Sequence, residues 1–199
     1  MNPDIELLIN RIEQKELKIH VSLDRPVYKQ PEDSILYRSC RILLILGMIN
    51  LEKGLSKELI ACIDFILRNT EYQSKFILEY FKNNKELLNK LNSWKKQKNI
   101  ENDFYLIQYK SVPWDLRFND MFLFLSIRGF IDTKKTSDST KIIILEKGMN
   151  ISESLRSIFE EETNFLNLFN GKIKEKDTKR IITEVIPNTY WRENEKLIC

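Results

Sequence analysis

The sequence predicts a mostly α-helical fold with a small β wing, in a winged-helix architecture that combines a helix-turn-helix with a β-hairpin. Apolar residues recur at helical spacing along most of the chain. Only five of the 199 residues are glycine and five are proline, which favours long helices. Between residues 115 and 150 a helix, a polar loop, a β-branched strand and a turn follow in the order of a winged-helix unit. Two tandem helical or winged-helix lobes are the alternative arrangement.

The first region, residues 1–33, is expected to be a helix followed by a connector. Pro26 and Pro31 interrupt a polar stretch, so residues 19–33 are typical of a connector, in which His20–Leu23 can form a short strand. Before it, residues 1–18 place four aliphatic side chains three and four positions apart, as an amphipathic helix does: Ile5, Leu8, Ile9 and Ile12.

Residues 34–96 are expected to form a helical lobe that resembles a helix-turn-helix. A central helix is predicted over Ser34–Ile49, with Asp33 or Ser34 as its cap, because the segment from Ile42 onward is apolar almost all round. After a turn at 50–54, Ser56 can cap a second helix. A third helix is predicted over Tyr72–Trp94. Its outer face consists mostly of lysine and asparagine.

Residues 103–150 are expected to be the winged-helix unit, separated from the helical lobe by a polar boundary at 97–102. A strand is predicted over Phe104–Tyr109, with Pro113 after it, and Asp115 is expected to cap a helix that ends at Gly129. The wing follows as a loop over Thr133–Thr140 and a strand over Lys141–Leu145. A turn at Glu146–Gly148 then leads into the next helix.

The last region, residues 151–199, is expected to contain helices and a surface tail. A helix is predicted over Ser152–Phe169, because its apolar side chains recur with helical period. A basic turn over Gly171–Arg180 precedes a short helix, which Pro187 ends. Tyr190 and Trp191 lie in the tail. They are candidates for a protein interface, or for packing back onto the chain itself.

Catalytic and metal-binding signatures are missing from the sequence. His20 is the one histidine, and no partner motif for a triad or a metal site stands beside it. The cysteines, Cys40, Cys62 and Cys199, do not have the spacing of a zinc site. The five glycines are scattered and form no phosphate-binding loop. We therefore expect no catalytic, cofactor or metal residues, no small-molecule substrate and no enzymatic activity.

Hydropathy and cysteine usage predict a cytoplasmic location. The longest apolar run, Ile42–Ile49, is far shorter than the roughly 18 residues that a membrane span requires. The N-terminus lacks the pattern of a secretory signal, and an odd number of cysteines without a CxxC pair suits a reducing compartment. No contact with a membrane is expected.

The distribution of charge argues against DNA binding through the predicted recognition helix. In Asp115–Ile131 two arginines balance two aspartates, and in Asp132–Lys147 four lysines against three acidic residues leave +1. Residues 82–98 carry six lysines against one glutamate, which leaves +5; a solvated helix face explains this stripe equally well. The candidate contacts to DNA or to an acidic partner are Lys82, Lys85, Lys90, Lys95, Lys96, Lys98, Lys134, Lys135 and Lys141.

Several short motifs in residues 34–150 resemble the middle components of bacterial three-component ABC ATPase systems, including Lamassu-type anti-phage defence. The resemblance depends on Arg38–Leu46 (RSCRILLIL), on Gly54-Leu55-Ser56 with Leu59, and on the pairs Ile63-Asp64 and Leu67-Arg68. It also depends on Pro113-Trp114-Asp115, Arg128-Gly129-Phe130-Ile131 and Glu146-Lys147-Gly148.

The resemblance implies a small winged-helix subunit that associates with an SMC-like ABC ATPase and helps to control an effector nuclease. The chain would then be a non-catalytic adaptor in an anti-phage defence complex that senses DNA, and it would meet DNA through that complex. A free-standing winged-helix transcription regulator is the alternative, favoured by the wing and opposed by the neutral helix.

Overall fold

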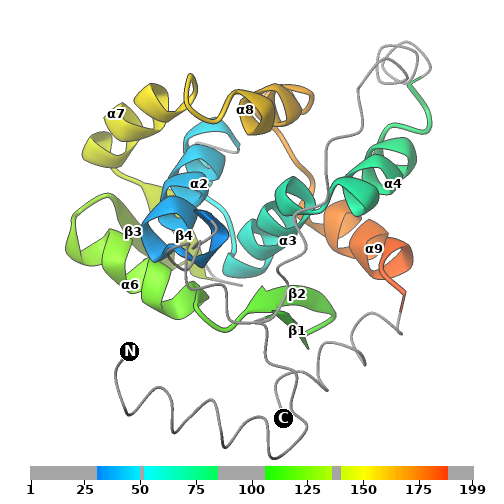
Figure 1. Cartoon of the computed structure of the whole chain (residues 1–199), viewed down its shortest axis with the longest axis horizontal. Helices are drawn as coiled ribbons and strands as arrows, with labels where there is room; N and C mark the ends of the chain where they lie inside the picture. The colour runs from blue at the N-terminus through cyan, green and yellow to red at the C-terminus, as the bar shows by residue number, and fades with distance from the viewer. Residues whose placement is uncertain (1–30, 50–51, 85–105, 136–139, 188–199) are drawn as a thin grey trace, which may run out of the picture. The chain divides into compact units, whose positions relative to one another are not determined.

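The computed structural model describes residues 31–49, 52–84, 106–135 and 140–187, which belong to one compact unit that begins at Pro31. This part is mostly helical, with two small antiparallel sheets of two strands each (Figure 1). The prediction of a mostly α fold with a small β part is therefore confirmed. The predicted N-terminal helix and connector strand, the boundary at 97–102 and the tail with Tyr190 and Trp191 lie outside the described residues.

Helix α2 (Ile35–Met48) is the hub of the unit. It follows the short 3₁₀ helix η1 (Pro31–Asp33), and the Ser34 hydroxyl accepts a hydrogen bond from the Tyr37 backbone N–H at its start. Its buried segment from Ile42 to Leu46 explains its position, because helices on several sides cover it. The sequence-based prediction of a central helix is confirmed.

The next two helices are α3 (Lys57–Arg68) and α4 (Thr70–Tyr80). Ser56 caps α3 as predicted, since its hydroxyl accepts the Leu59 backbone N–H at 3.1 Å. The third helix was predicted over Tyr72–Trp94, which is too long. Helix α4 ends at Tyr80, where the Tyr80 and Phe81 rings pack against Phe169 and the chain turns. Lys85 to Lys98 lie outside the described residues.

A hairpin stands where the sequence predicted one strand and a helix cap. Strands β1 (Leu106–Tyr109) and β2 (Val112–Asp115) pair antiparallel around Lys110 and Ser111, whose φ angles of 48° and 63° suit a tight two-residue turn. Pro113 lies inside β2, which is tolerated because a two-stranded sheet has only edge strands. The prediction that Asp115 caps the next helix is wrong, because Asp115 ends β2 and the N-cap position of that helix is Arg117.

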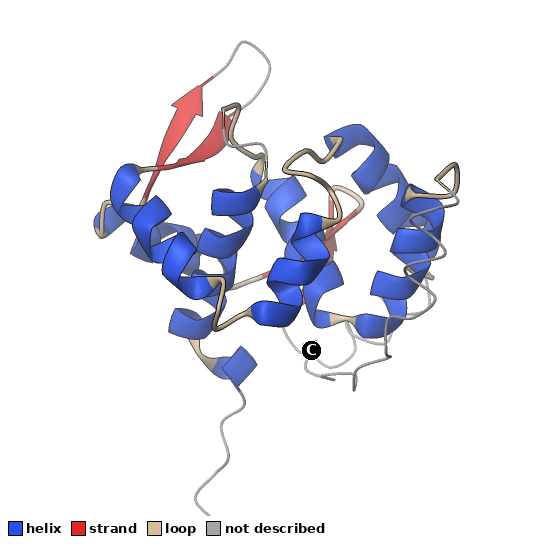
Figure 2. Cartoon of the chain, turned by 90° about the horizontal axis from the view of Figure 1, so that it is seen from above, coloured by secondary structure: helices blue, strands red, loops and turns tan. Residues whose placement is uncertain are grey.

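Helix α6 (Phe118–Ile127) leads into strands β3 (Ile131–Lys135) and β4 (Thr140–Ile144), which pair antiparallel. The predicted hairpin after this helix is thus present, although β3 extends into the predicted loop. Figure 2 shows this hairpin projecting beyond the helices. Leu55, between α2 and α3, exchanges backbone hydrogen bonds of 2.9 and 2.7 Å with Ile142. This isolated antiparallel bridge attaches the segment before α3 to strand β4.

The C-terminal part contains α7 (Glu146–Leu155), α8 (Glu160–Asn167) and α9 (Glu175–Val185). The single helix predicted over Ser152–Phe169 is wrong, because Phe159 leaves the helical conformation and packs its ring 5.0 Å from that of Tyr37. The predicted turn at Glu146–Gly148 is the first turn of α7. The predicted basic turn ends earlier than expected, since α9 already begins at Glu175.

One hydrophobic core connects these elements. It is continuous from α2 and α3 through α6 and β4 to α9, with Ile42, Phe65, Leu125, Ile142 and Ile182 among its buried members. Because α6 rests on this core through one side only, its opposite side is available to solvent.

Candidate functional site

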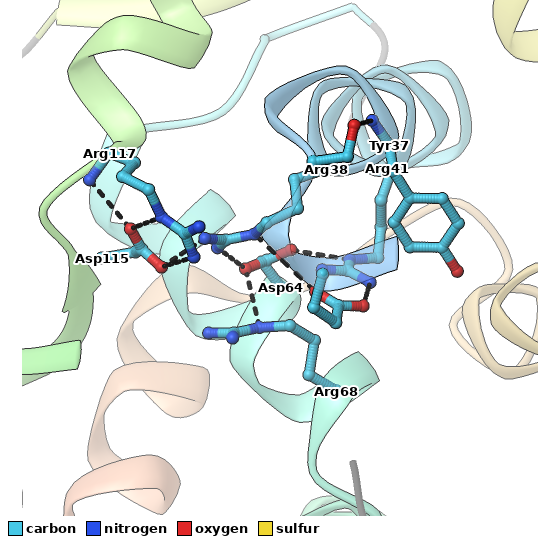
Figure 3. A network of polar contacts seen from close by, with 9 residues as sticks. Tyr37, Arg38, Arg41, Asp64, Arg68, Asp115 and Arg117 are labelled. Carbon is cyan, nitrogen blue, oxygen red and sulfur yellow. Dashed lines mark hydrogen bonds and ion pairs between the residues drawn. The ribbon is translucent and has the colours of Figure 1, made fainter. Parts of the chain in front are cut away.

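A cluster of buried charged side chains connects α2, α3 and β2 (Figure 3). Asp64 on α3 lies at its centre and is fully buried. Its carboxylate accepts Arg38 Nη2 at 2.9 Å and Arg41 Nε at 2.8 Å, and Arg68 Nε lies 3.2 Å away. One carboxylate therefore connects two arginines of α2 and one arginine of α3.

Two further carboxylates complete this buried ion cluster. Glu32 accepts Arg41 Nη2 at 2.6 Å, which connects η1 to α2. Asp115 at the end of β2 binds the Arg38 guanidinium, the backbone N–H of Arg117 at 2.8 Å and Arg117 Nε at 3.1 Å. Three buried acids face three buried arginines, so the buried charges balance, and the partly exposed Arg117 adds a fourth guanidinium group at the edge of the cluster.

The electrostatics of the buried ion cluster keep the carboxylates of Asp64 and Asp115 ionised. Burial alone would raise the pKa of Asp64, but the three guanidinium groups around it hold that pKa well below its usual range. Burial also acts to raise the pKa of Asp115, and hydrogen bonds from Arg117 together with the charge of Arg38 lower it overall. Such carboxylates are poor proton donors or acceptors near neutral pH. The cluster is suited to position β2, and with it α6, rather than to catalysis.

Large aliphatic side chains on the outer side of α6 point into solvent. Leu123 and Ile127 lie four positions apart and therefore share one side of the helix, and Leu116 is 46% exposed in the turn just before it. Leu123 is 60% exposed and Ile127 is 77% exposed. We call these three residues the α6 apolar face. Asp120 lies between them on the same side.

The opposite side of α6 is held firmly by the core and by cations. Phe118, Met121, Phe122 and Leu125 are buried. The Arg38 guanidinium lies 5.5 Å from the centre of the Phe118 ring, and Lys57 Nζ lies 5.2 Å from that of Phe122. The buried ion cluster thus contacts the inner side of the helix whose outer side is apolar and exposed.

A groove of about 580 Å³ lies next to the start of α6. Asn119 of α6 forms part of its wall, and Lys110 in the groove approaches Glu58 at 3.4 Å. The side chains that line the groove come from α3, both strands of the first hairpin, α6 and the start of β4: Lys57, Glu58, Tyr109, Lys110, Trp114, Asn119 and Thr140.

The lysines predicted to contact DNA or an acidic partner differ in their surroundings, because some are exposed and others form ion pairs. Lys134 and Lys135 are exposed on β3. Lys141 Nζ lies 2.6 Å from Glu175 of α9, and Lys82 Nζ lies 2.6 Å from Glu79. Lys85, Lys90, Lys95, Lys96 and Lys98 lie outside the described residues, as do Tyr190 and Trp191.

Glu175 connects α9 to two other elements. It accepts Ser56 Oγ at 2.5 Å, Lys141 Nζ at 2.6 Å and Lys179 Nζ at 2.8 Å. Burial acts to raise the pKa of Glu175, but these hydrogen bonds outweigh burial and lower it to about 2. Lys141 is therefore engaged inside the fold.

Groups that could perform chemistry are scarce in the described part of the chain. Burial raises the pKa of the Cys62 thiol far above its ordinary value, so this thiol stays protonated. Within residues 31–49, 52–84, 106–135 and 140–187, no three or more His, Cys, Asp or Glu residues are grouped to hold a metal ion. His20 lies outside these ranges. None of the helices in them is both long and apolar enough to cross a membrane.

Sequence reasoning missed both the α6 apolar face and the buried ion cluster. The signal for the cluster was present, because Arg41 and Asp64 stand inside apolar runs where charges need partners. The signal for the apolar face was the aliphatic residues opposite the inner stripe of α6. Comparisons with protein-family models, with characterised proteins and with solved structures found no match for the chain.

Proposed function

We propose that the chain is a non-catalytic adaptor subunit that packs a partner protein against the α6 apolar face. The observation that supports this most strongly is the exposure of Leu123 and Ile127 on one side of a helix whose other side is buried in the core, with Leu116 exposed just before it. Aliphatic side chains grouped on a surface and rimmed by polar residues mark protein interaction sites. Asp120 and Asn119 are exposed polar neighbours of this face.

The order of elements supports a winged-helix assignment as part of this proposal. Helix α2, the paired residue Leu55, α3, α6 and the β3–β4 hairpin follow the order of a winged-helix unit, in which the hairpin is the wing. Residues 69–117, with α4 and the first hairpin, would be an insertion between the second and third helices. Helix α6 then occupies the place of the recognition helix.

A helix that reads DNA must contact phosphates and base edges, which requires positive and polar side chains. Helix α6 instead presents leucine and isoleucine, and from Asp115 to Ile131 its two arginines are balanced by two aspartates. Arg117 already binds Asp115 inside the fold. The place of the recognition helix is thus better suited to a protein partner than to a duplex.

The partner that we propose is an SMC-like ABC ATPase that senses DNA, with an effector nuclease as the third component of an anti-phage defence complex in the cytoplasm. This part of the proposal depends on the resemblance of residues 34–150, in which Arg38, Arg41, Asp64, Arg68 and Asp115 all belong to the motifs. Those five residues form the buried ion cluster together with Glu32, so the motifs describe a scaffold.

Co-expression tests the proposal. The full chain should be produced with the products of its neighbouring genes and purified through a tag on this chain. We expect a large coiled-coil ATPase to co-purify, and we expect the isolated chain to show no nuclease or ATPase activity. A chain that stays unbound while an SMC-like ATPase is present in the same cells would contradict the adaptor role.

A winged-helix transcription regulator is the second candidate, because Lys134 and Lys135 are exposed on the projecting hairpin. A regulator would bind a specific duplex as the isolated protein. Its binding would depend on salt and would be lost when the exposed Lys134 and Lys135 are replaced by glutamate. Specific binding of this kind without any protein partner would favour the regulator over the adaptor.

A further inference from the structure

Two clefts on the side of α4 and α9 share Lys174 as a common wall. The larger, of about 450 Å³, lies between the end of α2 and the loop before α9 and includes Met48, Lys53, Lys172 and Ile173. The smaller, of about 280 Å³, lies between α4 and α9 and includes Lys82 and Arg180. We call the two together the Lys174 surface. Its basic residues come from three separate stretches of the chain.

Positive charge dominates the Lys174 surface. Five basic residues line the two clefts, against three acidic ones, Glu52, Glu79 and Asp177. Lys82 is bound to Glu79, and Arg180 is bound to Glu184 at 2.9 Å. Lys53, Lys172 and Lys174 are exposed, and no ion pair joins their side chains to a carboxylate in the described part of the chain. Three cations therefore face solvent around one cleft.

We propose that the Lys174 surface binds the phosphodiester backbone of a nucleic acid without reading its sequence. Four of the five basic residues are lysines, which act as mobile point charges and suit a row of phosphates. The planar fork of arginine would add bidentate contacts of fixed geometry to a carboxylate or a phosphate, whereas lysines make no such contacts and suit a backbone that is bound without reading its sequence. Lys82, which begins the +5 stripe of residues 82–98, lies at this surface.

This inference is independent of the adaptor role, since the Lys174 surface and the α6 apolar face share no residue. It assigns to the chain itself a direct contact with nucleic acid. Lys53, Lys172 and Lys174 are not held by ion pairs with the described residues, so the expected binding is electrostatic and depends strongly on salt.

The test compares two variants with the same change of charge. Lys172→Glu/Lys174→Glu reverses two lysines of the Lys174 surface, and Lys134→Glu/Lys135→Glu reverses two exposed lysines of the β3–β4 hairpin. Binding of the full chain to a short fluorescent DNA duplex and to a single-stranded RNA of the same length is measured by anisotropy over a series of salt concentrations. Circular dichroism and thermal unfolding confirm that both variants fold.

We expect the unchanged protein to bind at low salt and to lose affinity as salt rises. The Lys172→Glu/Lys174→Glu variant should bind at least about tenfold more weakly, with a salt slope smaller by about two, while the hairpin variant stays within about twofold of the unchanged protein. The stronger of the duplex and RNA signals identifies the nucleic acid. Absence of salt-dependent binding, equal loss in both variants, or loss in the hairpin variant alone would overturn the proposal.

Discussion

The buried ion cluster and the α6 apolar face invert the usual distribution of side chains between the interior and the surface. Arg38, Arg41 and Asp64 are buried among α2, α3 and β2, whereas Leu123 and Ile127 are 60% and 77% exposed on α6. The two regions are neighbours, because Arg38 contacts the inner side of α6 through Phe118. The inner side of α6 therefore contacts buried charges, and its outer side exposes apolar side chains to solvent.

The difference between them is that one region is compensated within the chain and the other is not. Each buried carboxylate has arginine partners, so the cost of burying its charge is offset by ion pairs and hydrogen bonds. The exposed aliphatic side chains of α6 have no such compensation from the described residues. The buried ion cluster therefore belongs to the architecture of the chain, and we propose that a second molecule covers the α6 apolar face.

Removal of the central carboxylate should have the largest effect on stability. Asp64→Ala leaves three arginines around an empty position, and breaking a buried ion pair in this way costs about 3–5 kcal/mol. Urea unfolding followed by circular dichroism measures the loss. Glu71→Ala, which removes the exposed ion pair with Lys75, is the control and should change stability far less. Similar losses in the two variants would show that the buried ion cluster does not hold α2 and α3 together.

Gly54 should be the next most sensitive position, because it brings Leu55 to the β4 strand. Its φ is +66°, and a Cβ there would lie 2.5 Å from the Ile142 carbonyl oxygen. We expect Gly54→Ala to lower the unfolding free energy by about 3 kcal/mol, from left-handed strain plus collision.

Gly129 provides the matched control, with a φ of +69° but open space around it. Gly129→Ala should therefore cost only about 1 kcal/mol, the strain alone. Thermal unfolding of both variants measures the difference. Equal losses would mean that the Leu55–Ile142 pairing contributes nothing to the attachment of the hairpin.

Glu175 should contribute a smaller stabilisation that depends on pH. Its pKa is lowered from 4.5 to about 2 in the folded protein, so its stabilisation is complete above about pH 4.5 and is lost as the pH falls toward 2. Glu175→Gln should cost about 1 kcal/mol at neutral pH, a modest value because the carboxylate is partly exposed.

Urea unfolding of the unchanged protein and of the Glu175→Gln variant at a series of pH values isolates this carboxylate from the other acids. The stability difference between the two proteins should shrink steadily between about pH 4.5 and pH 2. A difference that stays constant over this range would show that ionisation of Glu175 does not stabilise the fold.

Local patterns in the sequence were enough to predict the elements that depend on local interactions. The apolar run from Ile42 predicts α2, Ser56 predicts the start of α3, and the β-branched run Ile142–Ile144 predicts β4. The break between α7 and α8 was not predicted in this way; at the break, Phe159 makes a tertiary contact with Tyr37, which no local pattern shows. Strand β2 was missed because Pro113 argues against a strand unless that strand lies at an edge.

The candidate site was beyond prediction from periodicity. Helix α6 carries apolar residues on both of its sides, and the sequence does not say which side meets the core. The partners of Asp64 on α2 are also hidden, because Arg38 and Arg41 lie 26 and 23 positions away along the chain. Only folding brings such residues together. Charged residues within apolar runs were the one signal that buried charges would require partners of opposite charge.

The measurement that tests the central claim most directly compares two pairs of exposed aliphatic residues. Leu123→Glu/Ile127→Glu changes the α6 apolar face. Leu36→Glu/Ile158→Glu changes residues of the same types with matching exposure, 61% and 73%, elsewhere on the described surface.

Both double variants should unfold within about 0.5 kcal/mol of the unchanged protein, because exposed substitutions seldom affect stability. Each is then co-expressed with the neighbouring SMC-like ATPase and purified through a tag on this chain. We predict that the ATPase is lost from the α6 variant and retained by the Leu36→Glu/Ile158→Glu variant. Retention of the ATPase by a folded α6 variant would contradict the claim that this face docks the partner.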